Sequence, residues 1–222
     1  MNIEQRSKHL LSLGIFGQAK LTLDSFQMSL TAPDQYVLRM MIKSPEADGF
    51  IIPDELKWLE PAILACHKVQ CERFVDHPYA YVTVRSGIVT STTDDLWHVD
   101  GFSMRVPHLP EQNYIWTDAQ PTEVLNQVFD IPKDFDPFKH NIHQYFQDHE
   151  AGEIITLEPE RFYVIDPYVV HRRPSVTAGI RRTFVRISFI PIEIEDDTCN
   201  QNSLLPHKNY GRPDIRQRLV RY

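Results

Sequence analysis

Short strand-like segments follow one another from Pro78 to Ile192 and limit the folds open to this chain. The first, Tyr79–Arg85, is β-branched and aromatic, and Ser86-Gly87 predicts its end. Further candidates follow at Leu96–His98, Phe102–Val106, Tyr114–Thr117, Ile154–Leu157, Phe162–Ile165, Val169–His171 and Arg182–Ile192. A series of short strands with only one helical insert, near 122–149, favours a sandwich or jelly roll over a βαβ fold.

The part of the chain before these strands is expected to be helical and to cover them. Asn2 can cap a helix that ends at Gly14, and Pro33-Asp34 can open a second helix through Lys43. A third helix is expected after Pro61, because apolar residues recur there at helical spacing. These residues are Ala62, Ala65, Cys66 and Val69.

The length of 222 residues fits one domain. We expect a helical cover over 1–77, a jelly-roll core over 78–191 with the insert at about 122–149, and a C-terminal extension over 192–222. The extension is acidic and then basic, and we expect it to pack over the core or to mediate a homodimer. A composition of 42% hydrophobic and 24% charged residues excludes wholesale disorder.

Composition also narrows the compartment and the partners. Three cysteines, Cys66, Cys71 and Cys199, exclude a disulfide-dense secreted scaffold and fit a reducing, cytoplasmic setting. The apolar patch Leu10–Phe16 is too short for a membrane span or a secretory signal. A net charge of −7 argues against a broad nucleic-acid surface, although a local basic patch stays open.

His98 and Asp100 are the first candidate functional residues. Residues two apart in a strand point to the same side, so an imidazole and a carboxylate can meet one point there. A His-x-Asp pair also occurs by chance in a chain of this composition. Two later residues make it a stronger candidate. His171 ends another strand-like run, and Arg182 opens a strand eleven residues later. Two imidazoles and one carboxylate form the facial triad of non-haem iron(II) oxygenases.

The order Trp97-His98-x-Asp100, His171, Arg182 resembles the iron(II)/2-oxoglutarate-dependent dioxygenases. The pattern is similar to the phytanoyl-CoA hydroxylase-like and taurine dioxygenase-like branches, with Arg181 and Arg182 ten and eleven residues after His171 and Arg186 four further on. The resemblance covers about residues 79–190 and implies a double-stranded β-helix of the cupin-like, jelly-roll kind. It also implies Fe(II) held by His98, Asp100 and His171, with 2-oxoglutarate and O2 as co-substrates and hydroxylation as the reaction.

Two arginines compete for the role of 2-oxoglutarate anchor. The resemblance implies Arg182, whereas Arg186 followed by Ser188 fits the pattern of other branches. Four strand residues span about 13 Å, so the two arginines do not clasp one carboxylate together. With Arg182 as the anchor, Arg186 is left for a substrate anion or for a structural acid.

Residues on neighbouring predicted strands are candidates for substrate contact. The set is Arg105, Tyr114, Trp116, Tyr81 and Arg85, and ordinary sheet packing is the alternative for each. A local concentration of arginines (Arg172, Arg173, Arg181, Arg182, Arg186) points to a small anionic or zwitterionic metabolite, or to ion pairs with the acidic tail.

Other histidine-containing groups compete as metal sites. Cys66, His67 and Cys71 lack a second pair of ligands and are expected to be packing residues. For His140, His143, Asp148, His149 and Glu150 we expect a solvated helix face, and the alternative is that one of these histidines reaches the mouth of the site. Two other functions stay open: a cupin-like metal enzyme that does not use 2-oxoglutarate, and a non-catalytic jelly-roll binding module.

Overall fold

The computed structural model describes residues 15–17, 25–90, 96–100, 111–132, 134–135, 140–175, 177–194 and 199–205. The helix expected after Asn2, the strand Phe102–Val106 and the basic end of the C-terminal extension lie outside these residues. Within the described residues, no helix is both long and apolar enough to cross a membrane.

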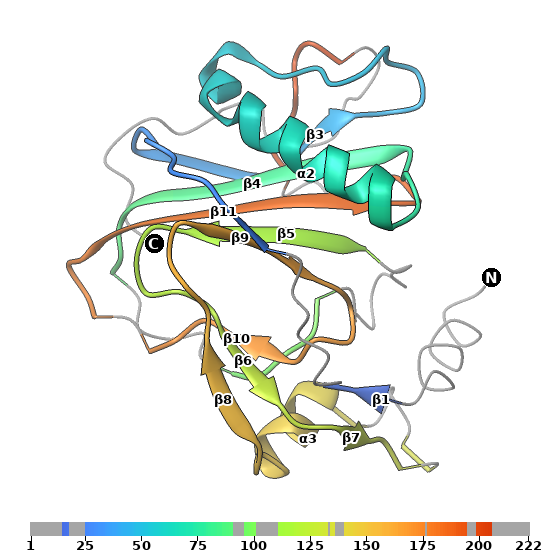
Figure 1. Cartoon of the computed structure of the whole chain (residues 1–222), viewed down its shortest axis with the longest axis vertical. Coiled ribbons are helices and arrows are strands. Elements are labelled where there is room, and N and C mark those ends of the chain that lie inside the picture. Colours follow the sequence, from blue (N-terminus) through green and yellow to red (C-terminus); the bar gives the residue numbers. More distant parts are fainter. Residues whose placement is uncertain are drawn as a thin grey trace.

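An antiparallel sheet of six strands forms the centre of the molecule (Figure 1). Its strand order is β2-β9-β5-β11-β4-β3. The bounds are β2 Ser25–Gln27, β3 Gln35–Lys43, β4 Tyr79–Ile88, β5 Gln112–Thr117, β9 Arg161–Ile165 and β11 Arg181–Ile190. The two longest strands, β4 and β11, pair along their whole lengths, from Arg181 opposite Ile88 to Ile190 opposite Tyr79.

A smaller antiparallel sheet lies on one side of the six-stranded sheet, with the order β10-β6-β8 (Figure 1). It contains β6 Glu123–Asn126, β8 Glu153–Thr156 and β10 His171–Arg172. The short strands β1 Ile15–Phe16 and β7 Phe129–Asp130 pair beside it, near the helix α3 Ile142–Asp148. Ile115, Ile165 and Tyr163 of the large sheet pack with Val124 of the small one, so apolar side chains fill part of the space between the two sheets.

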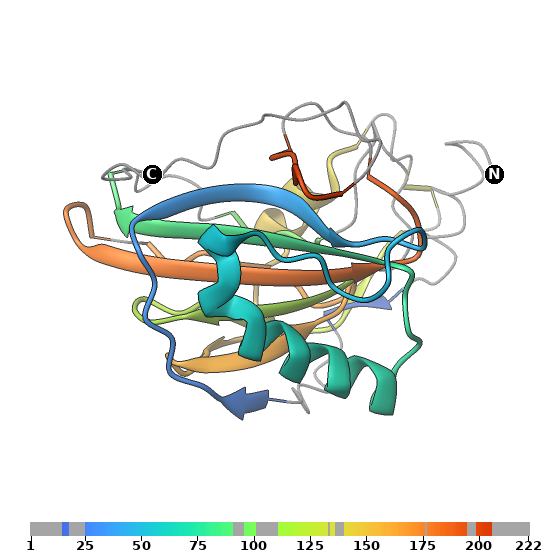
Figure 2. The same ribbon diagram turned by 90° about the horizontal axis from the view of Figure 1, so that it is seen from above.

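Helix α2, Glu60–Arg73, lies along the opposite face of the large sheet, as Figure 2 shows. It follows the 3-10 turn η1 Asp54–Leu59, and Pro61 occupies its first turn, where the missing N–H costs no hydrogen bond. Its residues Ala62, Ile63 and Cys66 are fully buried against the sheet. The helix predicted after Pro61 is therefore confirmed, and both faces of the large sheet are covered.

The helix predicted from Pro33 to Lys43 is wrong, because this segment forms β3 at the edge of the large sheet. Val37, Met40 and Ile42 all pack in the α2-side core, a spacing that a regular strand cannot produce. A bulge between Val37 and Met40, with Arg39 at a φ of 43°, shifts the alternation by one residue. The cover over 1–77 is consequently part strand and part helix.

Two further boundaries differ from the sequence expectation. Strand β4 continues through Ser86-Gly87 to Ile88, because its pairing with β11 supplies partners to the whole length. The segment 122–149 is only partly helical, since β6 and β7 precede α3 within it. The described part of the C-terminal extension packs over the core, where Asn200 exchanges hydrogen bonds with the backbone of Leu38 on the edge strand β3.

Candidate metal centre

The segment Leu96–Asp100 alternates between the core and a cavity, as expected of an extended chain. Trp97 and Val99 are buried in an apolar cluster with Leu125, Phe146 and Val170. His98 and Asp100 therefore point to the opposite side, where both line a cavity. The indole Nε1 of Trp97 donates a 2.6 Å hydrogen bond to Glu150, which fixes the segment against the end of α3.

The backbone brings His98 and His171 side by side. Their N–H and C=O groups exchange two hydrogen bonds of 2.9 Å each, forming an isolated antiparallel bridge. The two imidazole centroids lie 4.5 Å apart, and the Nε2 atom of His171 is 3.7 Å from Oδ2 of Asp100. One donor atom from each of His98, Asp100 and His171 lies within 4.8 Å of the other two. The convergence expected for His98 and Asp100 is confirmed, and His171 joins them.

Backbone carbonyls set the orientation of both imidazoles. The Nδ1 atom of His98 lies 2.8 Å from the carbonyl oxygen of Leu96, and that of His171 lies 2.9 Å from the carbonyl oxygen of Val169. A carbonyl can only accept, so each Nδ1 carries a proton, and in the neutral form of each ring the lone pair is on Nε2. This arrangement is typical of histidines that bind metals through Nε2.

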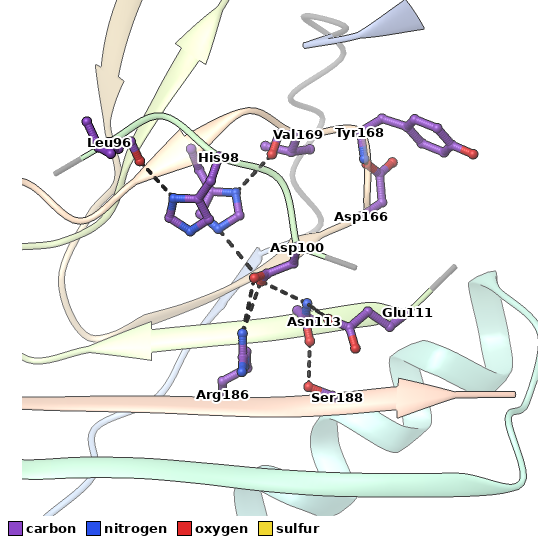
Figure 3. A network of polar contacts seen from close by, with 11 residues as sticks. Leu96, His98, Asp100, Glu111, Asn113, Asp166, Tyr168, Val169, Arg186 and Ser188 are labelled. Atoms are coloured by element: carbon purple, nitrogen blue, oxygen red, sulfur yellow. Dashed lines mark hydrogen bonds and ion pairs between the residues drawn. The ribbon is translucent and has the colours of Figure 1, made fainter. Parts of the chain in front are cut away.

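Asp100 is held by a network that begins on β11. Arg186 contacts both carboxylate oxygens, and Asn113 donates a 2.9 Å hydrogen bond to Oδ2. Asn113 in turn accepts a hydrogen bond from Ser188. Figure 3 shows the carboxylate of Asp100 between His98 on one side and Arg186 and Asn113 on the other. Burial alone would raise the pKa of Asp100, but the positive charges around it, Arg186 first, hold the pKa below its ordinary value.

His171 is neutral under ordinary conditions. Burial, reinforced by the neighbouring His98, lowers the pKa of His171 to about 4. His143 of α3 stands beside the same group, with its ring centroid 6.0 Å from that of His98. Its pKa is also lowered to about 4, first by burial and then by His98. One histidine of the segment 140–150 thus reaches the candidate centre.

The triad opens into a cavity of about 130 Å³ between the two sheets. The lining residues are Thr83, Arg85, His98, Asp100, Ile115, Thr122, His171, Arg172, Arg173, Arg182, Phe184 and Arg186. Arg182 is almost fully buried, and its Nε atom donates to the carbonyl oxygens of Ala119 and Gln120 at 3.0 and 3.1 Å. Both candidate anchor arginines therefore face the same cavity from one strand.

The expectations for substrate contact are corrected at three positions. Tyr114 and Trp116 lie on the other face of β5, where their polar atoms bond Gln70 and the carbonyl oxygen of Met28. Tyr81 lies on the cavity side of β4 but beyond the cavity, where its hydroxyl accepts a hydrogen bond from the Ile194 N–H beneath the C-terminal extension. Arg85 does line the cavity, and Arg105 lies outside the described residues.

Sequence reasoning missed Asn113, Thr122 and Thr83. Asn113 is the most informative of these, because it is fully buried and contacts a triad residue directly. The available signal was a polar amide directly before the apolar run Tyr114–Trp116, since a buried amide needs hydrogen-bond partners. That this partner is Asp100 could not be predicted from the sequence, because it depends on how the strands pair.

A second group with metal-ligand chemistry lies beside the C-terminal half of α2, near the end of β3. The Nε2 atom of His67 is 3.2 Å from Asp76 and 3.3 Å from the thiol of Cys71. The ammonium of Lys43 already binds the same oxygen of Asp76 at 2.8 Å. Cys66 is buried in the apolar core, as expected of a packing residue. Among the described residues, the segment 140–150 does not form a separate group of three ligands.

Comparisons with known proteins do not assign a family. No family model matches the chain, and no curated protein matches it. Among solved structures, AviO1 from Streptomyces viridochromogenes Tue57 matches with 17% identity and a TM-score of 0.37, over 86% of this chain and 84% of that one. EvdMO1 matches with 18% identity and a TM-score of 0.36, over 75% of this chain and 38% of that one. HygX from Streptomyces hygroscopicus, with nickel and 2-oxoglutarate bound, matches with 10% identity and a TM-score of 0.37, over 99% and 92%.

Proposed function

We propose that the chain is an iron(II)- and 2-oxoglutarate-dependent dioxygenase that hydroxylates a small molecule. The convergence of His98, Asp100 and His171 carries this proposal, because all three face one arginine-lined cavity. The two antiparallel sheets that enclose the cavity are consistent with a double-stranded β-helix, which we propose as the fold.

The donor set fits a divalent iron ion. Two neutral imidazoles and one ionised carboxylate are the ligands of the facial triad, which leaves three positions of an octahedral ion for other ligands. The Nδ1–H bonds to Leu96 and Val169 present both Nε2 lone pairs, and the lowered pKa values of Asp100 and His171 keep these groups deprotonated at neutral pH. A metal therefore has no proton to displace from either residue.

Arg182 is the proposed anchor for the distal carboxylate of 2-oxoglutarate. Arg186 is engaged by both oxygens of Asp100, so its guanidinium already has a carboxylate partner. Arg182 faces the same cavity four residues away, and the carbonyl oxygens of Ala119 and Gln120 hold its Nε atom. A guanidinium fixed in this way presents its planar fork in one orientation, which suits a carboxylate.

The residues of the chain position and enclose the reactants. Bound iron and 2-oxoglutarate would supply the oxidising chemistry, in which O2 gives one oxygen atom to a substrate C–H bond and one to succinate, with release of CO2. Arg186 and Asn113 hold the Asp100 carboxylate, and Ile115 and Phe184 provide an apolar wall beside it. Exclusion of water by such walls strengthens each electrostatic contact in the cavity.

Anaerobic titration of the metal-free protein with iron(II) and 2-oxoglutarate tests the proposal. A visible metal-to-ligand charge-transfer band is expected in the wild type, absent in His98→Ala and shifted to higher 2-oxoglutarate concentration in Arg182→Gln. Lys68→Gln removes a positive charge from the exposed side of α2 and should leave the band unchanged.

Each other outcome points to a different function. Iron binding without any band on adding 2-oxoglutarate would favour a cupin-like metal enzyme that does not use this co-substrate. Folded protein that binds no iron would favour a non-catalytic binding module. A band lost in Arg186→Gln but kept in Arg182→Gln, with iron affinity unchanged in both, would move the anchor to Arg186.

A further inference from the structure

The cavity holds more positive charge than the proposed metal centre uses. Five of its described lining residues are arginines: Arg85, Arg172, Arg173, Arg182 and Arg186. Asp100 is the one acidic residue among the described lining residues. Glu123 neutralises Arg172 from outside the lining, and iron(II) and the 2-oxoglutarate dianion together add no net charge, so loading the centre would still leave an excess of positive charge. An excess of one sign in a partly enclosed site favours a ligand of the opposite sign.

Three of the five arginines have assigned roles or partners. Arg186 binds Asp100 at 3.2 Å, and Arg172 donates a 2.6 Å hydrogen bond to Glu123 while stacking 4.1 Å from the ring of Trp97. Arg182 is the proposed co-substrate anchor. The candidate for ligand binding is Arg85, whose place in the cavity is fixed by the pairing of β4 with β11.

Arg85 stands between the metal centre and the proposed anchor. On the paired strands β4 and β11, Thr83 lies opposite Arg186, Arg85 opposite Phe184, and Gly87 opposite Arg182. Residues two apart on a strand are about 7 Å apart on the same face. Along the strand direction, the backbone of Arg85 is therefore about 7 Å from the position of Arg186 and about 7 Å from the position of Arg182.

One donor of the Arg85 side chain has no acceptor in the part of the chain that the structure describes. This donor is the Nε atom, which is buried. A buried donor without an acceptor costs free energy, and more so on a charged group. A ligand oxyanion in the cavity would satisfy this donor and neutralise the charge.

We propose that the substrate carries an oxyanion group, a carboxylate, phosphate or sulfate, which Arg85 binds in a forked pair beside the 2-oxoglutarate site. This inference rests on the proposed dioxygenase function and gives its substrate a chemical class. Arg173, on the segment that follows His171, lines the same cavity. Neutral analogues of the substrate would leave the Arg85 donor unpaired and would bind more weakly.

Sulfate is a suitable probe for this site. Calorimetric titration of the anaerobic iron(II)–2-oxoglutarate complex with sulfate, at ionic strength held constant with chloride, should show saturable binding in the wild type. Arg85→Gln should weaken sulfate binding at least about tenfold, because a charge-assisted pair is lost. Arg85→Lys should retain part of the affinity, since it keeps the charge but not the fork. Lys68→Gln, which makes the same change in net charge, should bind sulfate as the wild type does.

The co-substrate titration separates this inference from the proposed function. In Arg85→Gln the charge-transfer band should form at the wild-type 2-oxoglutarate concentration. If that concentration rises as it does in Arg182→Gln, Arg85 belongs to the co-substrate and the inference is overturned. Equal sulfate affinity in Arg85→Gln and wild type would also overturn it, as would no saturable binding in the wild type. If no variant shows the band but sulfate binding depends on Arg85, the anion site stands and the dioxygenase proposal fails.

Discussion

The Nη1 atom of Arg186 lies 3.2 Å from each carboxylate oxygen of Asp100. Both side chains are largely buried, with 14% and 13% of their surface exposed, so water screens the pair only weakly. The contact joins β11 to the segment after His98, two parts of the chain 86 residues apart. It gives Arg186 a structural acid as its partner, which was one of the two alternatives that the sequence left open.

Replacing Arg186 with Met should destabilise the metal-free protein. The buried carboxylate of Asp100 would lose its main compensating charge, and breaking such a pair costs roughly 3–5 kcal/mol. The free energy of unfolding, measured in urea, should fall by about this amount. Asp100→Asn in the same chain should recover much of the loss, because no buried charge then remains. If Arg186→Met alone were as stable as the wild type, the contact with Arg186 would not be what stabilises the buried carboxylate of Asp100.

The sequence predicted the parts of the site that depend on local geometry. His98 and Asp100 share a side because residues two apart in an extended chain always do. Helix α2 was also predictable from local geometry, since its buried residues lie along one stripe of a helix. The proximity of His171 followed from a resemblance and not from geometry, because no local rule pairs it with His98.

The faces of the central strands were not predictable in this way. Both faces of the large sheet are buried, one by α2 and one by the small sheet, so apolar residues occupy both phases of β5. Ile115 faces the cavity while Tyr114 and Trp116 face the helix, and hydrophobicity alone does not distinguish them. In β3 the bulge at Arg39 breaks the two-residue period that would have indicated a strand.

The stability of the metal-free protein should fall as the pH drops below about 6.5. The pKa of His171 in the folded state is about 4, against an ordinary value of 6.5, so the unfolded chain binds more protons between these values. Stability from this source is complete above pH 6.5 and is lost as the pH falls toward 4, by at most about 1.4 kcal/mol per pH unit for one histidine. His143 adds a loss of the same sign.

Urea unfolding at a series of pH values between 4.5 and 7.5 measures this slope. In His143→Gln this slope should be smaller by the contribution of about one proton. The variant no longer has a histidine at 143 whose pKa differs between the folded and the unfolded state. Equal stability at pH 5 and pH 7 would contradict the burial of neutral histidines at this site.

Replacing Trp116 with Phe should lower stability without changing the metal centre. The indole Nε1 of the buried Trp116 donates a 2.7 Å hydrogen bond to the carbonyl oxygen of the half-buried Met28, and Phe removes this donor and leaves a smaller ring in the core. The expected loss is about 1–3 kcal/mol in the free energy of unfolding. Iron and 2-oxoglutarate affinities, measured by anaerobic titration, should match the wild type, since Trp116 faces α2. A variant of normal stability with weakened 2-oxoglutarate binding would instead place Trp116 in the site.

Substitution of one histidine in each cluster should show which cluster binds the metal. His171→Ala removes a buried donor from the group formed with His98 and Asp100, whereas His67→Ala removes the imidazole shared by Cys71 and Asp76. We expect iron(II) and cobalt(II) affinity, measured calorimetrically, to fall at least about 100-fold in His171→Ala, because two ligands hold a divalent ion far less well than three. His67→Ala should bind as the wild type does, since the ammonium of Lys43 already occupies the acidic oxygen there. Loss of metal binding in His67→Ala but not in His171→Ala would show that the metal binds to the group of His67, Cys71 and Asp76. The dioxygenase proposal would then lose its basis.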